Sequence, residues 1–420
     1  MQAPWSFWFF RLLTGVILLR LLVEAGLELI NMRHLRRGAG NVPQPLRQHL
    51  SPRTHRKTAA YGIAAGRWHL CVLPAQLAIA AAFIFTGIFD NIDQWLTHLA
   101  PKQPLTRSAF YPFIIVGLNS MLLQPLELYR LFVVEQRFGF NRTSLRTYVI
   151  DRLKSALLLL LLGWPVAILL LWLIEHAPTT WWLAGWGVVT SLQIALITAL
   201  PTLMRVFYQL TPLREGPLKQ RLLQLARTHK IPVCDIVVMN GSSRSNHSNA
   251  FFTGLGRTRR IVLFDTLLAR MDHDEIVAVV AHEMGHDAAR DVTAGLRLWA
   301  LLYLIAFGAL AFCLNQPSFF HALGCRGTGA HIGLVLFGWF APMFLFPLKP
   351  LHNFLSRRQE YAADRFSVRI TKDPDSLIRA LFQLAKDNLS NPQPHPLYLA
   401  YHHSHPTALQ RVHAIAGICP

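Results

Sequence analysis

Charged residues are scarce in this chain of 420 residues, at 15%, whereas a soluble domain carries about 25%. Hydrophobic residues account for 52%, and the mean hydropathy is +0.32. This composition excludes a disordered or collagen-like chain and argues against an ordinary soluble protein. We therefore expect much of the length to lie in a membrane rather than in two or three soluble domains.

Cysteine is scarce too, with five residues scattered along the chain and no Cys-X-X-Cys pair. An odd number of isolated thiols argues against a disulfide framework and against a cysteine-rich zinc site. The first ten residues lack the basic stretch that opens a cleavable signal peptide, so none is expected.

Acidic residues number only 22 against 41 Lys and Arg, which leaves a net charge of +19. Such a charge is also found in nucleic-acid-binding proteins. Here, however, the basic residues flank apolar runs, and neither a long basic tail nor an RNA-binding motif is present. We therefore interpret the charge as membrane topology and expect no nucleic-acid partner.

Seven apolar segments are long enough to cross a membrane, which takes about 20 residues. The first contains Arg20, Glu24 and Glu28, and Arg20 could pair with Glu24 four residues further on. The last two could instead be re-entrant or soluble core helices. The segments span roughly 7–31, 68–89, 109–128, 155–175, 181–204, 293–314 and 330–349.

The basic loops orient these segments, because Lys and Arg gather on the cytoplasmic side. Eight basic and no acidic residues lie within 32–67, and six basic residues lie within 129–154. The connections on the opposite side contain only three basic residues, which are Lys102, Arg107 and Arg326. We therefore expect an outward N-terminus, with these cytoplasmic segments: 32–67, 129–154, 205–292 and 350–420.

The largest polar block, 205–292, is predicted to form a small folded unit. A helix begins at Pro217, and β-rich runs follow at 233–239, 248–253 and 260–265, the last two as a hairpin. Another helix begins at Asp272, where Glu275 completes a capping box.

That second helix carries the motif His282-Glu283-Met284-Gly285-His286. Residues four apart share a helix face, so the two imidazoles can bind one metal ion. Glu283 lies beside them, where it can take a proton from metal-bound water. The alternative is a pair of histidines on a polar helix face, but the apolar run and capping box before the motif favour a metal site.

A catalytic zinc site also needs a third protein ligand and an open position. Glu360 and Asp364 are again four apart, so one carboxylate can bind the metal while the other holds a ligand histidine. Alone, such a pair is more typical of a solvated helix face. Both motifs nevertheless fall on the side that the charge pattern makes cytoplasmic.

A third cluster near the C-terminus contains His402, His403 and His405, followed by Arg411. Three histidines in four residues could form an accessory metal site, although surface or interface positions are the default interpretation. We favour His405 as a hydrogen-bond donor to the oxyanion of the reaction.

Together these motifs resemble the type 1 CAAX prenyl endopeptidases, which are membrane-embedded zinc metalloproteases of the gluzincin type. HExGH, SRRxExxAD (356–364) and SHPxxxxR (404–411) occur in the order and spacing of that family. The resemblance covers nearly the whole chain. Further similar stretches are 31–43, 138–141, 151–154, 243–252 and 260–268.

The resemblance implies one Zn²⁺ per chain, bound by His282, His286 and Glu360. It implies that Glu283 is the general base and that Asp364 is the hydrogen-bond partner of a ligand histidine. Both roles follow from motif positions that this sequence matches.

The resemblance further places His405 and Arg411 near the scissile carbonyl or the substrate end. It places Asn249 and Ala250 on an edge strand that pairs with the substrate backbone. One departure concerns Asp287 and Asp291, since the family often has an aromatic and then a basic or histidine residue after the metal motif. These two acids put the substrate in doubt rather than the chemistry.

We accordingly predict a mostly α-helical polytopic membrane protein of about seven transmembrane helices, with a cytoplasmic zincin-like α+β domain that carries a small sheet. The resemblance implies that the helices enclose a hydrated chamber, which would also explain the charges of Arg20, Glu24 and Glu28. Residues 1–204 form a membrane domain of about five helices with basic cytoplasmic loops. Residues 205–420 form the peptidase domain and include the two later membrane segments.

The predicted function is that of a membrane-integrated zinc metalloendopeptidase. Its substrates would be CAAX-type, prenylated polypeptides or other membrane-associated polypeptides. An inactive membrane scaffold or transporter that keeps the fold is the alternative. The expected location is a bacterial inner membrane, with the active site facing the cytoplasm, or the ER membrane in a eukaryote.

Overall fold

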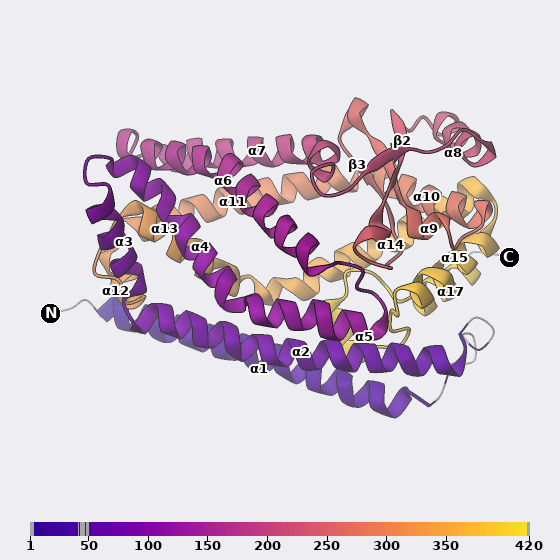
Figure 1. Cartoon of the computed structure of the whole chain (residues 1–420), viewed down its shortest axis with the longest axis horizontal. Coiled ribbons are helices and arrows are strands. Elements are labelled where there is room, and N and C mark those ends of the chain that lie inside the picture. The colour runs from indigo at the N-terminus through magenta and orange to yellow at the C-terminus, as the bar shows by residue number, and fades with distance from the viewer. Residues whose placement is uncertain (1–3, 41, 43–46, 48–49, 418–420) are drawn as a thin grey trace.

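The computed structural model describes residues 4–417 except 41, 43–46 and 48–49, and it is mostly helical. Long helices run back and forth between the two ends of an elongated molecule (Figure 1). Two short helices, α3 (Ile88–Leu99) and α12 (Pro317–Ala322), cap the end where α1 begins. The long helices are α1 (Pro4–Gly38), α2 (Pro52–Phe85), α4 (Pro104–Tyr129), α6 (Leu145–His176), α7 (Trp181–Met204), α11 (Asp291–Leu314) and α13 (Ala330–Phe344).

Six helical segments of the described chain are long and apolar enough to cross a membrane. With α1, which packs along α2, they confirm the prediction of about seven membrane helices. The two later segments do not turn back, since α11 is one helix of 24 residues and α13 continues through η5 (Phe346–Leu348) into α14 (Lys349–Thr371). The six are Pro52–Phe85, Pro104–Phe138, Leu145–His176, Trp181–Met204, Asp291–Leu314 and Ala330–Thr371.

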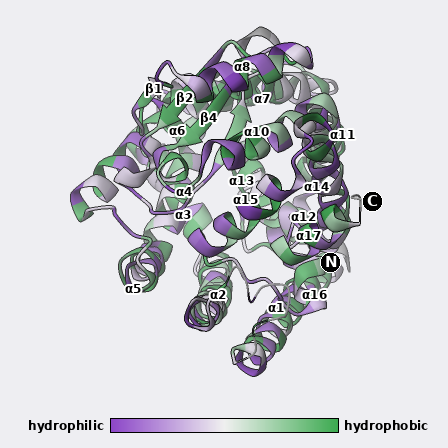
Figure 2. Cartoon of the chain, turned by 90° about the vertical axis from the view of Figure 1, so that its right-hand side faces the viewer, coloured by the Kyte–Doolittle hydropathy of each residue, from purple (hydrophilic) through white to green (hydrophobic). Residues whose placement is uncertain are grey.

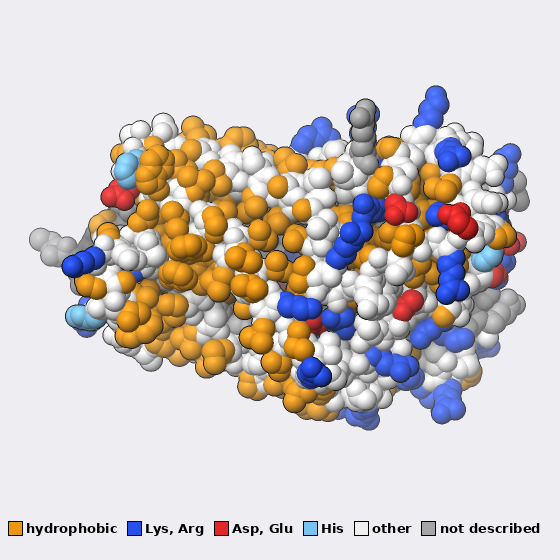
Figure 3. Space-filling view, turned by 45° about the horizontal axis from the view of Figure 1, so that its top comes forward, with side chains coloured by type: hydrophobic (Ala, Val, Ile, Leu, Met, Phe, Trp, Pro, Cys, Tyr) orange, Lys and Arg blue, Asp and Glu red, His pale blue; other side chains and the backbone are white. Residues whose placement is uncertain are grey.

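The segments rich in Lys and Arg share one end of the molecule, here called the basic end. There α1 finishes and α2 begins, α5 (Gln136–Phe138) leads into α6, and the small sheet follows the end of α7 (Figure 1). Figure 3 shows apolar side chains over the opposite half and Lys and Arg gathered at this end. The structure thus has the alternation that the charge pattern predicts, while the side of the membrane that the basic end faces stays a prediction.

Local signals explain where the helices at the basic end start and stop. The hydroxyl of Ser144 accepts a hydrogen bond from the Thr147 amide at 3.1 Å and so caps α6. Earlier in the chain, α4 passes into a π-helical turn, η2 (Arg130–Glu135), and then into α5. Gly139 follows the last residue of α5 and ends the helix with a φ of 84°, a left-handed conformation that glycine adopts without strain. The division predicted at residue 204 falls where α7 ends, and it stays a prediction.

A four-stranded sheet at the basic end has the order β1-β2-β4-β3, which leaves β3 at an edge. β3 and β4 form the predicted antiparallel hairpin, whereas β2 and β4 are parallel. β3 starts at Ala250, not at the predicted 248, because the Asn388 side chain bonds both backbone groups of Ser248. The strands are β1 (Leu210–Pro212), which was not predicted, β2 (Asp235–Met239), β3 (Ala250–Thr253) and β4 (Arg260–Phe264).

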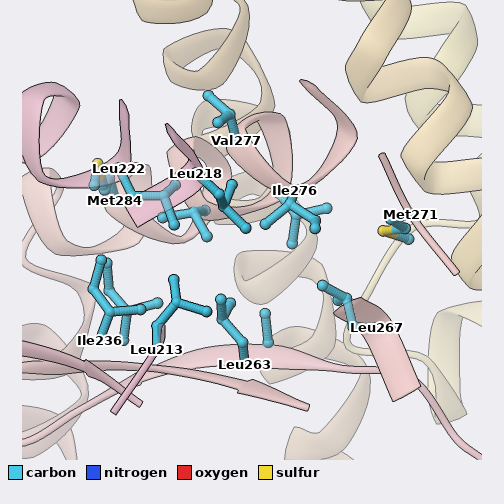
Figure 4. Packing of buried hydrophobic residues seen from close by; sticks show 14 of the residues in the cluster. Leu213, Leu218, Leu222, Ile236, Leu263, Leu267, Met271, Ile276, Val277 and Met284 are labelled. Atoms are coloured by element: carbon cyan, nitrogen blue, oxygen red, sulfur yellow. The ribbon is translucent and has the colours of Figure 1, made fainter. Parts of the chain in front are cut away.

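One face of the sheet packs against α8 (Pro217–Thr228) and α10 (His273–Ala288) to form a closed apolar core. In Figure 4 Ile236 and Leu263 point from the sheet toward Leu222 of α8 and Ile276 of α10. This packing fixes α10, the predicted metal helix, against a rigid support. The remaining helices of this unit are α9 (Asp265–Leu268), α15 (Pro374–Asp387), α16 (Pro396–His402) and α17 (Ala408–Ala416).

Candidate active site

Helix α10 begins with the predicted capping box. The Glu275 amide donates to Asp272 Oδ1 at 2.8 Å, and the Asp272 amide donates to Glu275 Oε2 at 3.1 Å. Residues 276–281 are all buried in the core. The helix therefore delivers His282 and His286 on its inward side at a fixed depth.

Helix α14 crosses α10 at very close range because Gly285 lies at the crossing. A Cβ on Gly285 would lie 2.8 Å from the Ala363 Cα and 3.1 Å from its carbonyl oxygen. The Ser367 hydroxyl also donates to the Ala278 carbonyl at 2.8 Å across the same pair of helices. This approach carries Glu360 of α14 to the histidines of α10.

His282, His286 and Glu360 offer three ligand atoms that all lie within 4.8 Å of one another. The two imidazole Nε2 atoms lie 3.4 Å and 3.3 Å from the Glu360 carboxylate oxygens. Glu360 Oε2 is buried and has no hydrogen-bond partner among the described residues. Arg411 Nη1 lies 3.5 Å from this oxygen, too far for a good hydrogen bond. A buried carboxylate whose two oxygens each face one imidazole suits a divalent cation with one open position.

A carboxylate also holds the other ring nitrogen of each ligand histidine. Asp364 Oδ1 lies 2.9 Å from His282 Nδ1, as predicted, and Asp291 Oδ2 lies 2.9 Å from His286 Nδ1. Such contacts fix the tautomer and ring orientation of metal-binding histidines. The role of Asp291 was missed because Arg290, with φ of 57°, turns the chain back toward His286 in a way that no helical spacing indicates.

The guanidinium of Arg411 holds Asp364 with two nitrogens, Nε at 2.8 Å and Nη2 at 2.5 Å. Burial lowers the pKa of Arg411, but the Asp364 carboxylate raises it by more. The net pKa shift is upward, so the guanidinium stays charged. The structure therefore directs Arg411 to the Asp364 carboxylate. Its predicted contact with substrate stays a prediction.

Ionisation in the site is set by burial and by these carboxylates. Burial lowers the pKa of His286, but hydrogen bonds to Glu360 and Asp291 raise it to about 9. Burial raises the pKa of Glu283, and the two nearby imidazoles oppose the shift only in part. A carboxylate with a raised pKa is suited to hold a proton briefly during a reaction.

The other acid after the metal motif, Asp287, is turned away from the ligands. Its carboxylate accepts a hydrogen bond from Arg259 Nη1 at 2.8 Å. Burial raises the pKa of Asp287, and Arg259 lowers it. Asp287 thus forms an ion pair with Arg259 beside the site, whereas Asp291 contacts the His286 ring.

His405 reaches the metal site from the open side. Its Nδ1 lies 2.9 Å from Glu360 Oε1, while 68% of its side chain is exposed. The histidine is therefore close enough to meet a substrate held at the metal, and its role as an oxyanion donor stays a prediction. His402 and His403 are not part of any further metal-binding group among the described residues.

Asn249 and Ala250 lie where the edge strand β3 begins. Asn249 accepts a backbone hydrogen bond from Phe264 of β4 at 3.1 Å, and β3 packs against α10. One side of β3 pairs with β4, and the other has no strand beside it within the described sheet. Pairing of these residues with a substrate stays a prediction.

The signatures at 138–141 and 151–154 join the membrane helices to the stretch that leads into β3. Arg244 makes two hydrogen bonds to Asp151, at 2.7 Å and 2.9 Å. Phe140 stacks on His247 with 3.9 Å between ring centroids, and Asn141 pairs with Ser245 in an isolated β-bridge. These motifs are docking points rather than ligands.

Comparisons with known proteins agree with this geometry. A family model described as CAAX prenyl protease N-terminal, five membrane helices, matches residues 31–208, and the model of peptidase family M48 matches residues 212–418. CAAX prenyl protease 1 of Saccharomyces cerevisiae is 30% identical over 402 residues, covering 89% of this chain and 88% of the yeast protein. The Arabidopsis thaliana homologue of that protease is 28% identical over 425 residues, and the alignment covers 97% of this chain and 98% of the Arabidopsis protein.

Among solved structures, the crystal structure of S. mikatae Ste24p aligns with a TM-score of 0.89 at 28% identity, covering 99% of both chains. The similarity includes both the helical membrane part and the unit that holds the two histidines and Glu360. An inactive scaffold receives no support from these relatives. The chain therefore belongs to peptidase family M48 and is a membrane-embedded metalloprotease.

Proposed function

We propose that this protein is a zinc endopeptidase that cleaves CAAX-type, prenylated polypeptides or other membrane-associated polypeptides. The observation that carries the proposal is the convergence of His282, His286 and Glu360 beside Glu283, at one end of a membrane helix bundle. The names of the curated relatives, CAAX prenyl proteases, support the substrate class.

His282, His286 and Glu360 would hold one zinc ion, with Asp364 and Asp291 fixing the two imidazole rings. When bound, zinc supplies a Lewis acid that polarises a peptide carbonyl and makes water a better nucleophile. Glu283 takes the proton of the attacking water and passes it to the leaving amine. His405 donates a hydrogen bond to the oxyanion that develops on the carbonyl.

The free side of β3 would align the substrate. An extended peptide can add to a sheet edge through backbone hydrogen bonds, so recognition there depends little on side chains. Asn249 and Ala250 lie at the start of that strand, which packs against the metal helix. Arg411 would act near the end of the substrate only if substrate displaces part of its contact with Asp364.

The basic end would face the cytoplasm, because Lys and Arg gather there. The membrane would be the inner membrane in a bacterium or the ER membrane in a eukaryote. In a bacterium, where protein prenylation is generally lacking, the substrates would be other polypeptides at the membrane.

The test uses the full chain in detergent with three fluorescent peptides: a farnesylated CAAX peptide, its unprenylated form and an unrelated sequence of equal length. The matched control is Glu283→Gln, which keeps the side-chain shape but cannot accept a proton. We expect zinc in both proteins, cleavage by the native chain, and a rate about 10²- to 10⁴-fold lower in the variant. Equal cleavage by both proteins would refute the role of Glu283, and an absence of cleavage with zinc bound would refute the proposed function.

A further inference from the structure

Three buried polar side chains lie on one face of the first membrane helix. Glu24, Glu28 and Asn31 are spaced four and three residues apart on α1, and they are only 4%, 3% and 5% exposed. Ionisable groups are costly in a membrane helix and usually mark a site with a role. The expected pairing of Arg20 with Glu24 is present at 3.2 Å, but it explains only one of the three.

Each of these residues bonds a residue of α16 or its N-cap. Tyr401 donates to Glu24 and Tyr398 donates to Glu28, both at 3.2 Å, and the His395 amide donates to Asn31 at 3.1 Å. The partners are three residues apart, so one face of α16 meets one face of α1 in antiparallel register. Figure 2 shows the two helices side by side at the basic end.

The phenol groups are suited to this task. Burial raises the pKa of Tyr398, and the Glu28 carboxylate raises it further, so the hydroxyl stays protonated and donates. Glu28 also bonds His69 of α2 at 2.7 Å, which ties the contact to a second membrane helix. Hydrogen bonds to a charged acceptor are stronger than those between neutral groups.

Helix α14 holds the C-terminal end of α16. Asn353 Nδ2 donates to the Tyr401 carbonyl at 2.6 Å, and Arg357 Nη1 donates to the His403 carbonyl at 2.7 Å. A helix of seven residues has no stability of its own, so its position is decided by these neighbours. Two residues after His403 the chain reaches His405 and the Glu360 carboxylate.

We propose that Glu24, Glu28 and Asn31 form a positioning face that sets the place of His405 through α16. The inference rests on the proposed function, in which His405 is an oxyanion donor. A slip of α16 by one turn along α1 would break all three hydrogen bonds and move His405 away from the metal ligands. The first membrane helix, more than 370 residues away in sequence, therefore contributes to transition-state stabilisation without touching substrate.

Because an oxyanion donor acts in the transition state, its displacement lowers kcat and leaves KM nearly unchanged. A misplacement of about 1 Å can reduce a rate about 100-fold, so partial loss of the register should cost about tenfold or more. Zinc binding should not change, since the three proposed ligands lie on α10 and α14 rather than on α1 or α16.

The central test is Tyr398→Phe, which removes only the hydroxyl that bonds Glu28. The matched control is Tyr61→Phe, which removes an equivalent Tyr–Glu hydrogen bond of 2.9 Å between α2 and Glu135 in η2. With the farnesylated peptide we expect kcat to fall about tenfold in the first variant and to stay within about twofold in the control. Equal effects on both, or a change confined to KM, would overturn the inference.

A second arm repeats Tyr398→Phe in a His405→Ala background. If α16 acts through His405, the second change adds no further loss, whereas independent effects would multiply. The same tenfold loss in both backgrounds would overturn the inference. Full activity of His405→Ala alone would instead refute the catalytic role of His405 and with it the inference.

A third arm does not depend on activity. Amide hydrogen exchange of residues 396–405 should become faster in Tyr398→Phe than in Tyr61→Phe, while exchange in α10 stays unchanged. Unchanged exchange in 396–405 would overturn the positioning role even if the protein cleaved none of the peptides.

Discussion

The crossing of α10 and α14 makes Gly285→Ala the most informative single change in the metal site. The added methyl group would lie 2.8 Å from the Ala363 Cα and 3.1 Å from its carbonyl oxygen. Both are backbone atoms that cannot rotate away, so the two helices must separate by several tenths of an ångström. Glu360 is on one helix and both ligand histidines are on the other, so the separation stretches the metal site.

Two opposing effects decide the magnitude. Replacing glycine by alanine inside a helix favours the helix by about 1 kcal/mol, because the unfolded chain loses freedom. Overpacking a close contact costs about 1–3 kcal/mol. The free energy of unfolding of the zinc-free protein should therefore fall by about 0–2 kcal/mol. The zinc-free protein can relieve part of this strain by separating the two helices, and that part then opposes zinc binding, which needs the native ligand spacing. Zinc affinity should therefore fall by up to about 150-fold.

The matched control is Gly295→Ala in α11, where an added methyl group meets no atom within 4 Å. It should keep native zinc affinity, and its stability should not fall. Zinc affinity is measured by competition with a chelator of known strength, and stability by thermal unfolding of the zinc-free protein in detergent. If Gly285→Ala binds zinc as tightly as Gly295→Ala does, the helix crossing does not set the ligand spacing and the reasoning is wrong.

Three further predictions concern the same unit. Asp291→Asn should weaken zinc binding about 10- to 100-fold, because Asp291 holds the His286 ring in place. Asp287→Asn is the control and should leave zinc binding unchanged, because Asp287 bonds Arg259 instead. Equal losses in both variants would show that the charge of these acids matters rather than the orientation of His286. Ala250→Pro should abolish or slow peptide cleavage while zinc stays bound, because proline lacks the N–H and resists strand pairing; loss of zinc as well would mean that β3 is plain core. Single cysteines at Glu215 and Thr328, in a cysteine-free background, should react with a membrane-impermeant reagent on opposite sides of the membrane; reaction on one side would refute the topology.

The two histidines of the proposed metal site could be predicted from a local rule, whereas the choice of Glu360 as the third ligand came from the family resemblance. His282 and His286 are four apart on one helix, and the capping box at Asp272 marks where that helix starts. The membrane helices could be predicted for a similar reason, since apolar runs of sufficient length are visible in any window of sequence. Such features depend on residues that are neighbours in the chain.

Features that depend on an unusual backbone conformation or on distant residues could not be predicted. Asp291 meets His286 only because Arg290 adopts a left-handed conformation, and nothing in its residue type requires one. Glu28 was correctly marked as unusual, but its partner Tyr398 lies 370 residues away. β3 begins later than predicted because Asn388, far along the chain, binds the backbone of Ser248.

The residues of the proposed metal site are separated by membrane helices in the order of synthesis. The two histidines of α10 come first, α11 and α13 follow, and only then does α14 bring Glu360. A nascent chain that ends before α14 therefore holds the two imidazoles and lacks the carboxylate that completes the set. The proposed metal site is therefore complete only after the chain that forms α11 and α13 has been made.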